Sequence, residues 1–473
     1  MNRKKPLFYL AHIQKKQFLK SVKRKKTERS RRAGFQRFLS LIKTQSILLK
    51  KDYNPPLYVI TRKYSKAGKK PKFNDIITFL IPKYMEFSCM SLPVYENGSL
   101  ELPEIFSIAD NHEESMFFLK RLFNVLYKQT NELIFLDYRK CNSLDVDASA
   151  CMDLILGGFI IYYKKCTTKG HQSKIKKIVP INIANPEVEK VLLSIGAFKN
   201  IKGFELQQQS DIIPFPLKIG DTVLDKRGTL KEIHETQIVD YVVKCLDTLG
   251  HALTPESESH LSKVVGEVMA NAEEHSNFRY RFAIGYFKKP IEENNDFGTF
   301  QLSIFNFGQT IYESFKREEC KGFDVVKRMK ELSEDFTRNG IFRKAEYEEQ
   351  TLWTLYALQE GVTSTKDWKR GKGTIRFIDR FFKLKGNGLN DNLSKLTLVS
   401  GNTKIIFDGT YPLKEVKKGN EKKPYQMMTF NVTGNIHEKP NNKFVTFVPQ
   451  YFPGTLITAK ISITPYIVEN SII

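Results

Sequence analysis

Glu267, Asn271 and His275 lie four residues apart and form the segment of this sequence best suited to chemistry. Side chains at this spacing share one face of an α-helix. An asparagine oxygen is a hard ligand of the kind that Mg²⁺ accepts alongside phosphates. A carboxylate one turn earlier can polarise a water or hydroxyl for attack on a phosphoryl group, and a histidine one turn later can donate to phosphate. The spacing by itself, however, is more typical of a helix with an ordinary polar solvent face.

Three further segments follow, and their order favours a nucleotide site over an ordinary polar helix face. Asn306-Phe307-Gly308 ends an apolar stretch, and Gly454-Thr455 precedes the last apolar run. Between them, a basic glycine-rich loop opens a stretch with helical spacing, a place where backbone N–H groups can cradle phosphate. This loop consists of Arg370, Gly371, Lys372, Gly373 and Thr374. One such motif is weak evidence, but four in this order indicate a nucleotide site.

Together these segments resemble the GHKL ATP-binding domain of histidine kinases, the DNA gyrase B subunit, a heat-shock chaperone family, the MutL mismatch-repair proteins and the bacterial anti-sigma-factor kinases. The first segment is most similar to the anti-sigma kinase type, and the resemblance spans about residues 229–463. It implies that ATP and Mg²⁺ bind, with Glu267 as the catalytic base, Asn271 as the Mg²⁺ ligand and His275 as the histidine of that subtype. The nucleotide contacts that it implies come from Asn271, His275, Asn306, Gly308, Arg370, Gly371, Lys372, Gly373, Thr374, Gly454 and Thr455.

The segment that should read the adenine departs from the family pattern. The family has Asp-x-Gly-x-Gly, whereas this chain has Asn306-Phe307-Gly308-Gln309-Thr310. An amide can accept a hydrogen bond from the adenine amino group but brings no charge, and the second glycine is missing. A degenerate site therefore stays an alternative. Residues 311–369 correspond to the family's ATP lid and are long for one, so we expect extra helices there that gate the pocket or contact a partner.

The middle of the chain carries a second resemblance. An apolar stretch, Leu133–Asp137, leads to Asp147 and Ser149 at the start of a helical pattern, and a further strand and helix follow near Pro186. This order resembles a STAS domain, the anti-sigma-factor-antagonist fold, in which a serine at a helix N-terminus accepts phosphate from a GHKL kinase. The resemblance implies Ser149 as phospho-acceptor. The alternative interpretation makes Asp147 and Ser149 capping residues of an ordinary helix, and the family's next glycine is Ala150 here.

The elements that position these residues follow from hydrophobic spacing. Strands are expected at residues 76–82, 133–137, 178–183, 280–287, 299–305, 395–399, 404–408, 427–432 and 454–463. Helices are expected at residues 114–129, 148–162, 186–196, 233–249, from Pro255 after a Thr254 cap, and within 311–360. The expected fold class is α/β: a basic helical extension and linker (1–72), a STAS-like α/β domain (73–205), a connector (206–228) and a GHKL α/β sandwich (229–473).

Positive charge is concentrated at the N-terminus. Residues 1–75 hold 23 of the 75 Lys and Arg residues but only 3 of the 52 Asp and Glu residues. The densest cluster comprises Lys23, Arg24, Lys25, Lys26, Arg29, Arg31 and Arg32. Basic side chains interleaved with Phe, Gln and Ser favour contact with a nucleic-acid backbone. A protein partner and an anionic membrane surface stay open as alternatives.

Several other classes of protein are excluded by the sequence. With 41% hydrophobic residues the body can bury a core, and the longest apolar stretch, residues 150–163, is too short and too interrupted by Asp153 for a membrane span. The N-terminus has no apolar stretch typical of a secretory signal. Six well-separated cysteines without a CxxC pair indicate reduced thiols, so we expect a cytoplasmic location. No P-loop, Rossmann fingerprint or acyl-transfer triad is present.

These features lead to one expected function and two alternatives. The first is a regulatory module that binds ATP and Mg²⁺ and whose lid closure controls engagement of a partner. In this module the basic N-terminal extension (residues 1–72, the basic head) binds a polyanion. Hydrolysis with Glu267 as base is secondary. The second is a protein serine/threonine kinase acting on Ser149 or on a partner's serine. The third is a non-enzymatic nucleic-acid-binding scaffold with a degenerate nucleotide site. A protein partner at the STAS-like domain or the lid, and a dimer, are further expectations.

Overall fold

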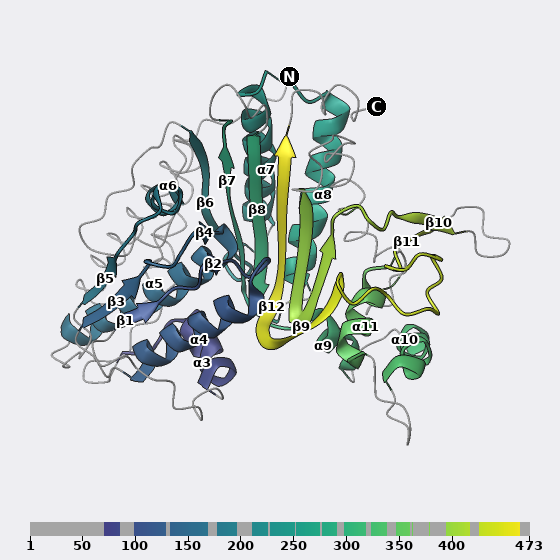
Figure 1. Ribbon diagram of the computed structural model, residues 1–473, viewed down its shortest axis with the longest axis horizontal. Helices are drawn as coiled ribbons and strands as arrows, with labels where there is room; N and C mark the ends of the chain where they lie inside the picture. The colour runs from purple at the N-terminus through teal and green to yellow at the C-terminus, as the bar shows by residue number, and fades with distance from the viewer. Residues whose placement is uncertain are drawn as a thin grey trace, which may run out of the picture. The chain divides into compact units, whose positions relative to one another are not determined.

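A small parallel sheet organises the first half of the described chain (Figure 1). The computed structural model describes residues 71–85, 99–128, 133–168, 177–195, 211–225, 228–250, 252–274, 277–290, 298–317, 323–337, 347–359, 362, 378, 394–416 and 425–463. The basic cluster at residues 23–32 therefore lies outside the described residues. Strands β1 (Ser99–Glu101), β3 (Leu133–Asp137) and β5 (Lys177–Ile181) pair in parallel in the order β1-β3-β5, and β2 (Ile105–Phe106) pairs with β4 (Ser143–Leu144).

Four helices accompany these strands: α3 (Asp75–Met85), α4 (His112–Lys128), α5 (Val146–Thr168) and α6 (Pro186–Ile195). The strand expected at residues 76–82 is wrong, because this segment lies within α3. Its buried residues Ile76, Ile77, Leu80 and Tyr84 recur at helical spacing, and a short apolar run is ambiguous between a strand and a buried helix. The helices expected at 114–129, 148–162 and 186–196 are confirmed within a few residues.

Helix α5 is the central helix of this half. Its segment Val146–Cys166 is long and apolar enough to cross a membrane, but 89% of it is buried inside the fold. Phe159 on α5 is fully buried and contacts the rings of Phe73, Phe123 and Tyr163. The burial is that of a core helix, so length and composition are weak evidence for a membrane span here.

The second half contains a five-stranded antiparallel sheet with the order β6-β7-β8-β12-β9. Its strands are β6 (Ile212–Asp221), β7 (Tyr280–Lys288), β8 (Gly298–Phe307), β9 (Lys395–Phe407) and β12 (Val445–Ile463). The connector expected at residues 206–228 is therefore partly wrong, because β6 pairs with β7 along Ile212–Asp221. Pro214 and Pro216 misled the prediction, since proline is tolerated on an edge strand.

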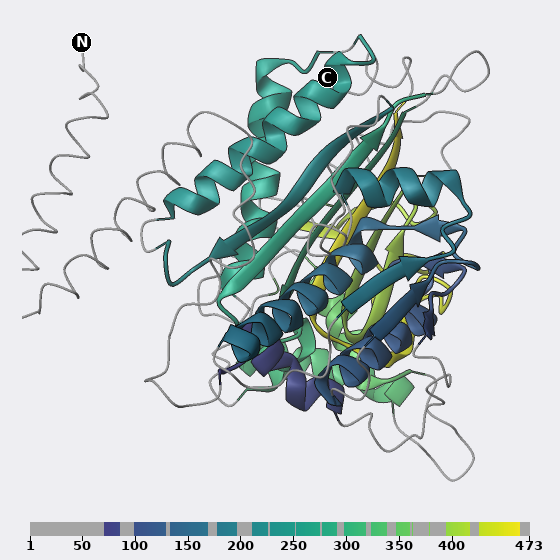
Figure 2. The same cartoon turned by 90° about the vertical axis from the view of Figure 1, so that its left-hand side faces the viewer.

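Each face of this sheet is covered by a different part of the chain (Figure 2). Phe300, Leu302 and Ile304 of β8 pack into a core shared with helices α7 (Thr229–Asp247) and α8 (Pro255–Glu274). Because side chains alternate along a strand, the intervening residues face the other way. Helix α5 contacts β7 and β8, and α4 contacts β12. The described residues of both halves thus belong to one compact unit of mixed α/β structure.

Most of the second half follows the sequence-based expectation. The Thr254 cap is confirmed, because its Oγ1 accepts the Ser257 N–H at 3.2 Å and α8 begins at Pro255. The strands expected at 395–399 and 404–408 form a single strand, β9, with Gly401 at a positive φ of 60° between them. The strand expected at 427–432 is reduced to β11 (Tyr425–Met427), which pairs with β10 (Lys414–Val416).

The expected lid differs from what its described part shows. It contains α9 (Ile311–Lys316), α10 (Phe323–Thr337) and α11 (Glu349–Ala357). Leu352 and Trp353 of α11 are buried in the same core as α7 and α8, and the Trp353 Nε1 donates to Ser333 Oγ of α10 at 3.1 Å. A mobile lid has few buried apolar contacts, so residues 311–359 are a poor candidate for one where they are described.

Loss of the Phe159 ring tests the central role of α5. Phe159→Ala should lower the free energy of unfolding by about 3–5 kcal/mol, since it opens a cavity among packed aromatic rings. Urea denaturation followed by circular dichroism measures this change. Lys128→Ala, at an exposed position at the end of α4, serves as the control and should change stability by less than about 0.5 kcal/mol. Equal effects from the two variants would contradict the assignment.

Candidate functional site

A row of small and polar residues crosses all five strands at one end of the large sheet. Register pairs Gly220 of β6 with Arg281 of β7, Arg281 with Asn306 of β8, Asn306 with Thr455 of β12, and Thr455 with Ser400 of β9. Asn306 has the same parity as Phe300, Leu302 and Ile304, so the row faces the α7–α8 side. Two of the motifs singled out in the sequence thus meet on one surface.

Asn306 and Thr455 are joined directly. The Asn306 side chain is 2% exposed, and its Oδ1 accepts the backbone N–H of Thr455 at 3.0 Å. This donor fixes the orientation of the amide, since only its oxygen can accept a hydrogen bond. The next turn is held as well, because the Gly308 N–H donates to the Pro453 carbonyl at 2.9 Å.

Gly454 is the residue that allows this close approach. Its φ is 154°, and a Cβ at this position would lie 2.0 Å from the Asn306 carbonyl oxygen. A side chain there would have to displace backbone rather than a flexible side-chain end. The glycine of the Gly-Thr segment is thus required by contact with the Asn306 segment, 148 residues earlier in the sequence.

Ser400 is a member of this site that sequence reasoning missed. Its Oγ accepts the Ile311 N–H at 2.9 Å and lies 2.9 Å from the Thr455 Oγ1. It therefore joins the first residue of α9 to the Gly-Thr segment. No local signal marked it, because a serine in an apolar strand pattern is common and its partners are distant in sequence.

Gln309 follows Gly308 in the chain and is buried. The side chain is 8% exposed, and its Oε1 accepts no hydrogen bond from the described part of the chain. Leaving a buried acceptor unsatisfied costs about 1–3 kcal/mol. Gln309 belongs to the Asn306–Thr310 segment, which departs from the Asp-x-Gly-x-Gly pattern of the resembled family.

Cationic groups lie at the β6–β7 end of the polar row. Arg281 lies over Gly220, where an added Cβ would come within 2.6 Å of the guanidinium carbon. Burial lowers the pKa of Arg281 to about 10, which leaves it charged at neutral pH. Burial, followed by the charges of Arg281 and Lys218, lowers the pKa of His234 to about 3. His234 is therefore neutral beside Arg281.

The residues expected to hold Mg²⁺ and phosphate are only partly described. The backbones of Glu267 and Asn271 lie in α8, whose Val265, Val268 and Met269 pack into the helix-side core. Their side chains, His275 and the loop Arg370–Thr374 lie outside the described residues. Within the part of the chain that is described, no cluster of three or more His, Cys, Asp or Glu residues could hold a metal ion. The Mg²⁺ site at Asn271 stays a prediction.

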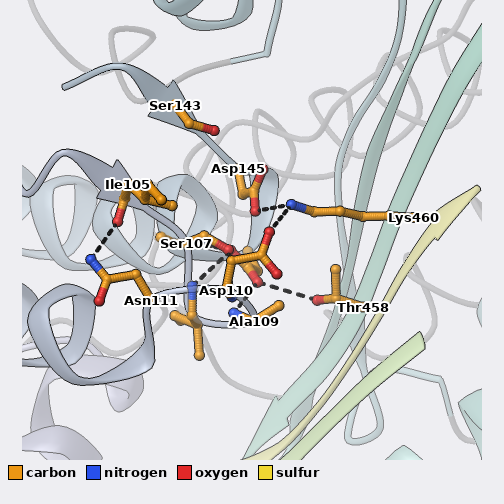
Figure 3. Close-up of polar contacts among 12 residues, drawn as sticks. Ile105, Ser107, Ala109, Asp110, Asn111, Ser143, Asp145, Thr458 and Lys460 are labelled. Atoms are coloured by element: carbon orange, nitrogen blue, oxygen red, sulfur yellow. Dashed lines mark hydrogen bonds and ion pairs between the residues drawn. The ribbon is translucent and has the colours of Figure 1, made fainter. Parts of the chain in front are cut away.

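On the opposite face of the sheet, Lys460 of β12 points toward Asp110 and Asp145 (Figure 3). Asp147 joins the two halves of the protein at the same place. Its buried carboxylate accepts the Ile108 and Ala109 N–H groups at 3.2 and 3.0 Å, and the Thr458 Oγ1 of β12 donates to it at 3.3 Å. Burial and the nearby Asp145 raise the pKa of Asp147 to about 7. These bonds give Asp147 a structural role between α5 and the sheet.

Ion pairs surround this contact. Lys460 of β12 pairs with both Asp110 and Asp145, and Lys395 of β9 pairs with Asp110 at 2.6 Å. The two carboxylates raise the pKa of Lys460 despite its burial. Removing one partner of such a buried group leaves the other as an unpaired charge in a poorly solvated place. The α/β half is thus held on the sheet by charges from both sides.

Ser149 lies next to this interface and is only 3% exposed. Its backbone N–H donates to the Asp145 carbonyl at 3.1 Å, within the first turn of α5. A kinase could reach the hydroxyl only if α5 moved away from its neighbours. The phospho-acceptor assignment stays a prediction, and the local bonds are those of a helix start.

Substitution of Gly454 tests the close approach of the two motifs. Gly454→Ala should destabilise the protein by more than about 3 kcal/mol, because the added methyl group meets the Asn306 backbone. Gly250→Ala is the matched control: its φ is also positive, at 79°, but nothing lies within 4 Å of an added Cβ. It should cost only about 1–2 kcal/mol of backbone strain. Thermal unfolding compares the two, and similar losses would contradict the steric assignment.

Comparison with protein-family models finds no match, and comparisons with curated proteins and with solved structures find no significant match either. The candidate site therefore rests on the residues and contacts described above.

Proposed function

We propose that residues 229–463 bind ATP with Mg²⁺ and act as a nucleotide-dependent regulatory module. The observation that carries this proposal is the direct pairing of Asn306 with Thr455, through a hydrogen bond of 3.0 Å at one end of an antiparallel sheet covered by α7 and α8. The two segments resemble the adenine-reading and Gly-Thr motifs of the GHKL family. Such motifs must lie together for a nucleotide to contact both.

The residues present are compatible with a purine nucleotide. Asn306 and Gln309 are carboxamides, which can both accept a hydrogen bond through oxygen and donate one through nitrogen. Bound Mg²⁺ would supply charge neutralisation at the phosphates. In this proposal Asn271 holds the metal and Glu267 orients a water, while Arg370, Lys372 and the glycines around them contact the phosphates.

Docking of the α/β half on the sheet supports a regulatory rather than a purely catalytic role. The same strand, β12, carries Thr455 toward the proposed nucleotide and carries Thr458 and Lys460 toward Asp147, Asp110 and Asp145. A change at Thr455 on nucleotide binding would thus be felt three residues away at the docking contacts. The kinase alternative is less favoured, since Ser149 is buried.

Nucleotide binding is tested first by titration calorimetry with a non-hydrolysable ATP analogue and Mg²⁺. The wild-type protein should bind, and Asn271→Ala should lose the Mg²⁺-dependent part of the affinity because the amide ligand is gone. Glu267→Ala should keep binding in this titration and should lose hydrolysis when ATP itself is supplied. Lys263→Ala, at an exposed position on the same helix, is the control and should behave like wild type. Absence of binding at millimolar nucleotide would remove the proposal.

Deletion of residues 1–75 tests the separate assignment of the basic head. The deleted segment carries 23 basic and 3 acidic residues, so its loss should abolish salt-sensitive binding to nucleic acid. ATP binding should be unaffected. Because α3 begins at Asp75 and packs against the core, a variant that replaces Lys23, Arg24, Lys25 and Lys26 by Gln is the milder companion. Strong nucleic-acid binding by both variants would contradict the assignment.

A further inference from the structure

We propose that Asp147 is a proton-binding site that makes the docking of the α/β half on the large sheet depend on pH. The inference is independent of the proposed nucleotide site, because it rests on other residues, on the opposite face of the sheet. It concerns three carboxylates that lie together where the two halves meet, those of Asp110, Asp145 and Asp147.

The lysines of this interface are directed at Asp110 and Asp145. Lys460 of β12 points toward both carboxylates and pairs with each (Figure 3). Lys395 of β9 pairs with Asp110 at 2.6 Å. Lys404, also on β9, lies close enough to Asp110 for the two charges to interact. The cationic groups are thus gathered around Asp110, with Lys460 shared between it and Asp145.

Asp147 is held by uncharged groups instead, as far as the described residues show. Its two oxygens accept the N–H groups of Ile108, Ala109 and Ala148 at 3.2, 3.0 and 2.6 Å, and the Thr458 Oγ1 lies 3.3 Å away. The side chain is fully buried. A negative charge in such a place is costly unless a cation pairs with it, so the site favours uptake of a proton.

Two hydroxyl groups allow the site to hold Asp147 in either protonation state. The Thr458 Oγ1 lies 3.3 Å from the Asp147 Oδ2 and 3.0 Å from the Ser303 Oγ of β8, and both hydroxyl residues are buried. A hydroxyl can donate or accept. The ionised carboxylate accepts from Thr458, which accepts from Ser303. The neutral acid donates to Thr458, which donates to Ser303, so both bonds reverse and neither is lost.

The surrounding titratable groups also favour the neutral acid. Burial, followed by the charge of Asp145, raises the pKa of Asp147 to about 7 against the opposing effect of Lys460. Cys151 of α5 and Tyr286 of β7 interact with Asp147 but are uncharged near pH 7, because burial raises the pKa of each. The other titratable groups on the elements that pack here are Asp110, His112, Lys395 and Lys404.

The sign of the pH dependence follows from the difference between the native and unfolded states. An unfolded aspartate has a pKa of about 3.9, so between about pH 4 and pH 7 the native protein holds a proton at Asp147 that the unfolded chain has released. The contribution of Asp147 to stability is therefore lost as pH rises through this window. His112 and His234 act in the opposite direction, since burial lowers the pKa of each, to about 4 and about 3.

The test compares urea unfolding of the full-length protein at pH 5, 6, 7 and 8 between wild type and Asp147→Asn, so that the histidine contributions cancel. The ratio of the wild-type unfolding constant to that of the variant should rise by up to about tenfold per pH unit between pH 5 and 7 and level off by about pH 8. A constant loss of stability in the variant leaves this trend unchanged. Asp240→Asn, at an exposed position on α7, is the control, and its ratio should not change with pH.

Hydrogen exchange locates the effect at the interface. After correction for the intrinsic exchange rate, a peptide spanning residues 105–112 should exchange faster at pH 8 than at pH 6 in wild type, because it carries the Ile108 and Ala109 N–H groups bonded to Asp147. Asp147→Asn should show no such difference. Helix α7, on the other face of the sheet, should change less than this peptide in wild type.

Asp145→Asn provides a second measurement if Asp147→Asn does not fold. Removing the neighbouring negative charge should lower the native-state pKa of Asp147, so the ratio of the wild-type unfolding constant to that of Asp145→Asn should also rise between pH 5 and 7, by a smaller factor.

Two results would overturn the inference. One is a ratio that stays constant from pH 5 to 8 against Asp147→Asn, or against Asp145→Asn if only that variant folds. The other is an equal change of exchange in α7 and in residues 105–112, which would show that the proton acts on the whole fold rather than on the docking contact.

Discussion

The pairing of β12 between β8 and β9 is the constraint on which both halves of the protein depend. Successive side chains of a strand point to opposite faces, so one strand can serve two layers. Thr455 faces the helix side with Asn306 and Ser400, while Thr458 and Lys460 face the α/β half. At the irregular part of β12, the Gln450 side chain accepts from Lys120 of α4 at 3.0 Å, and Tyr451 donates to Glu313 of α9 at 3.0 Å.

The contact between the two halves is unusually polar for a buried surface. Lys460 pairs with Asp110 and Asp145, and Asp147 is bonded to backbone N–H groups and to Thr458. Desolvating such charges offsets much of their attraction, so the net stabilisation is modest while the loss of one partner is costly. An arrangement of this kind specifies one docked position, since any shift would leave a charge unpaired.

Much of the secondary structure could be predicted from the sequence, because its signals are local. The cap at Thr254 and Pro255, the strand at Leu133–Asp137 and the helix from Pro186 are each specified by residues within a turn of one another. The misses share a cause. Residues 76–82 are apolar at a spacing that fits a strand or a helix, and β6 contains two prolines that are permitted only because it lies at a sheet edge.

The candidate site likewise has parts that the sequence predicted and parts that only the tertiary structure revealed. The sequence by itself singled out Asn306 and the Gly454-Thr455 pair and showed where the positive charge lies, because residue type and short spacing carry that information. Only the tertiary structure joined Asn306 to Thr455, revealed Ser400 and Gln309, and placed Lys460 of β12 between Asp110 and Asp145, a contact that reaches 350 residues back along the chain. The reason is physical: strand order and the burial of a particular amide depend on contacts between distant segments, and no local pattern records which strands will be neighbours.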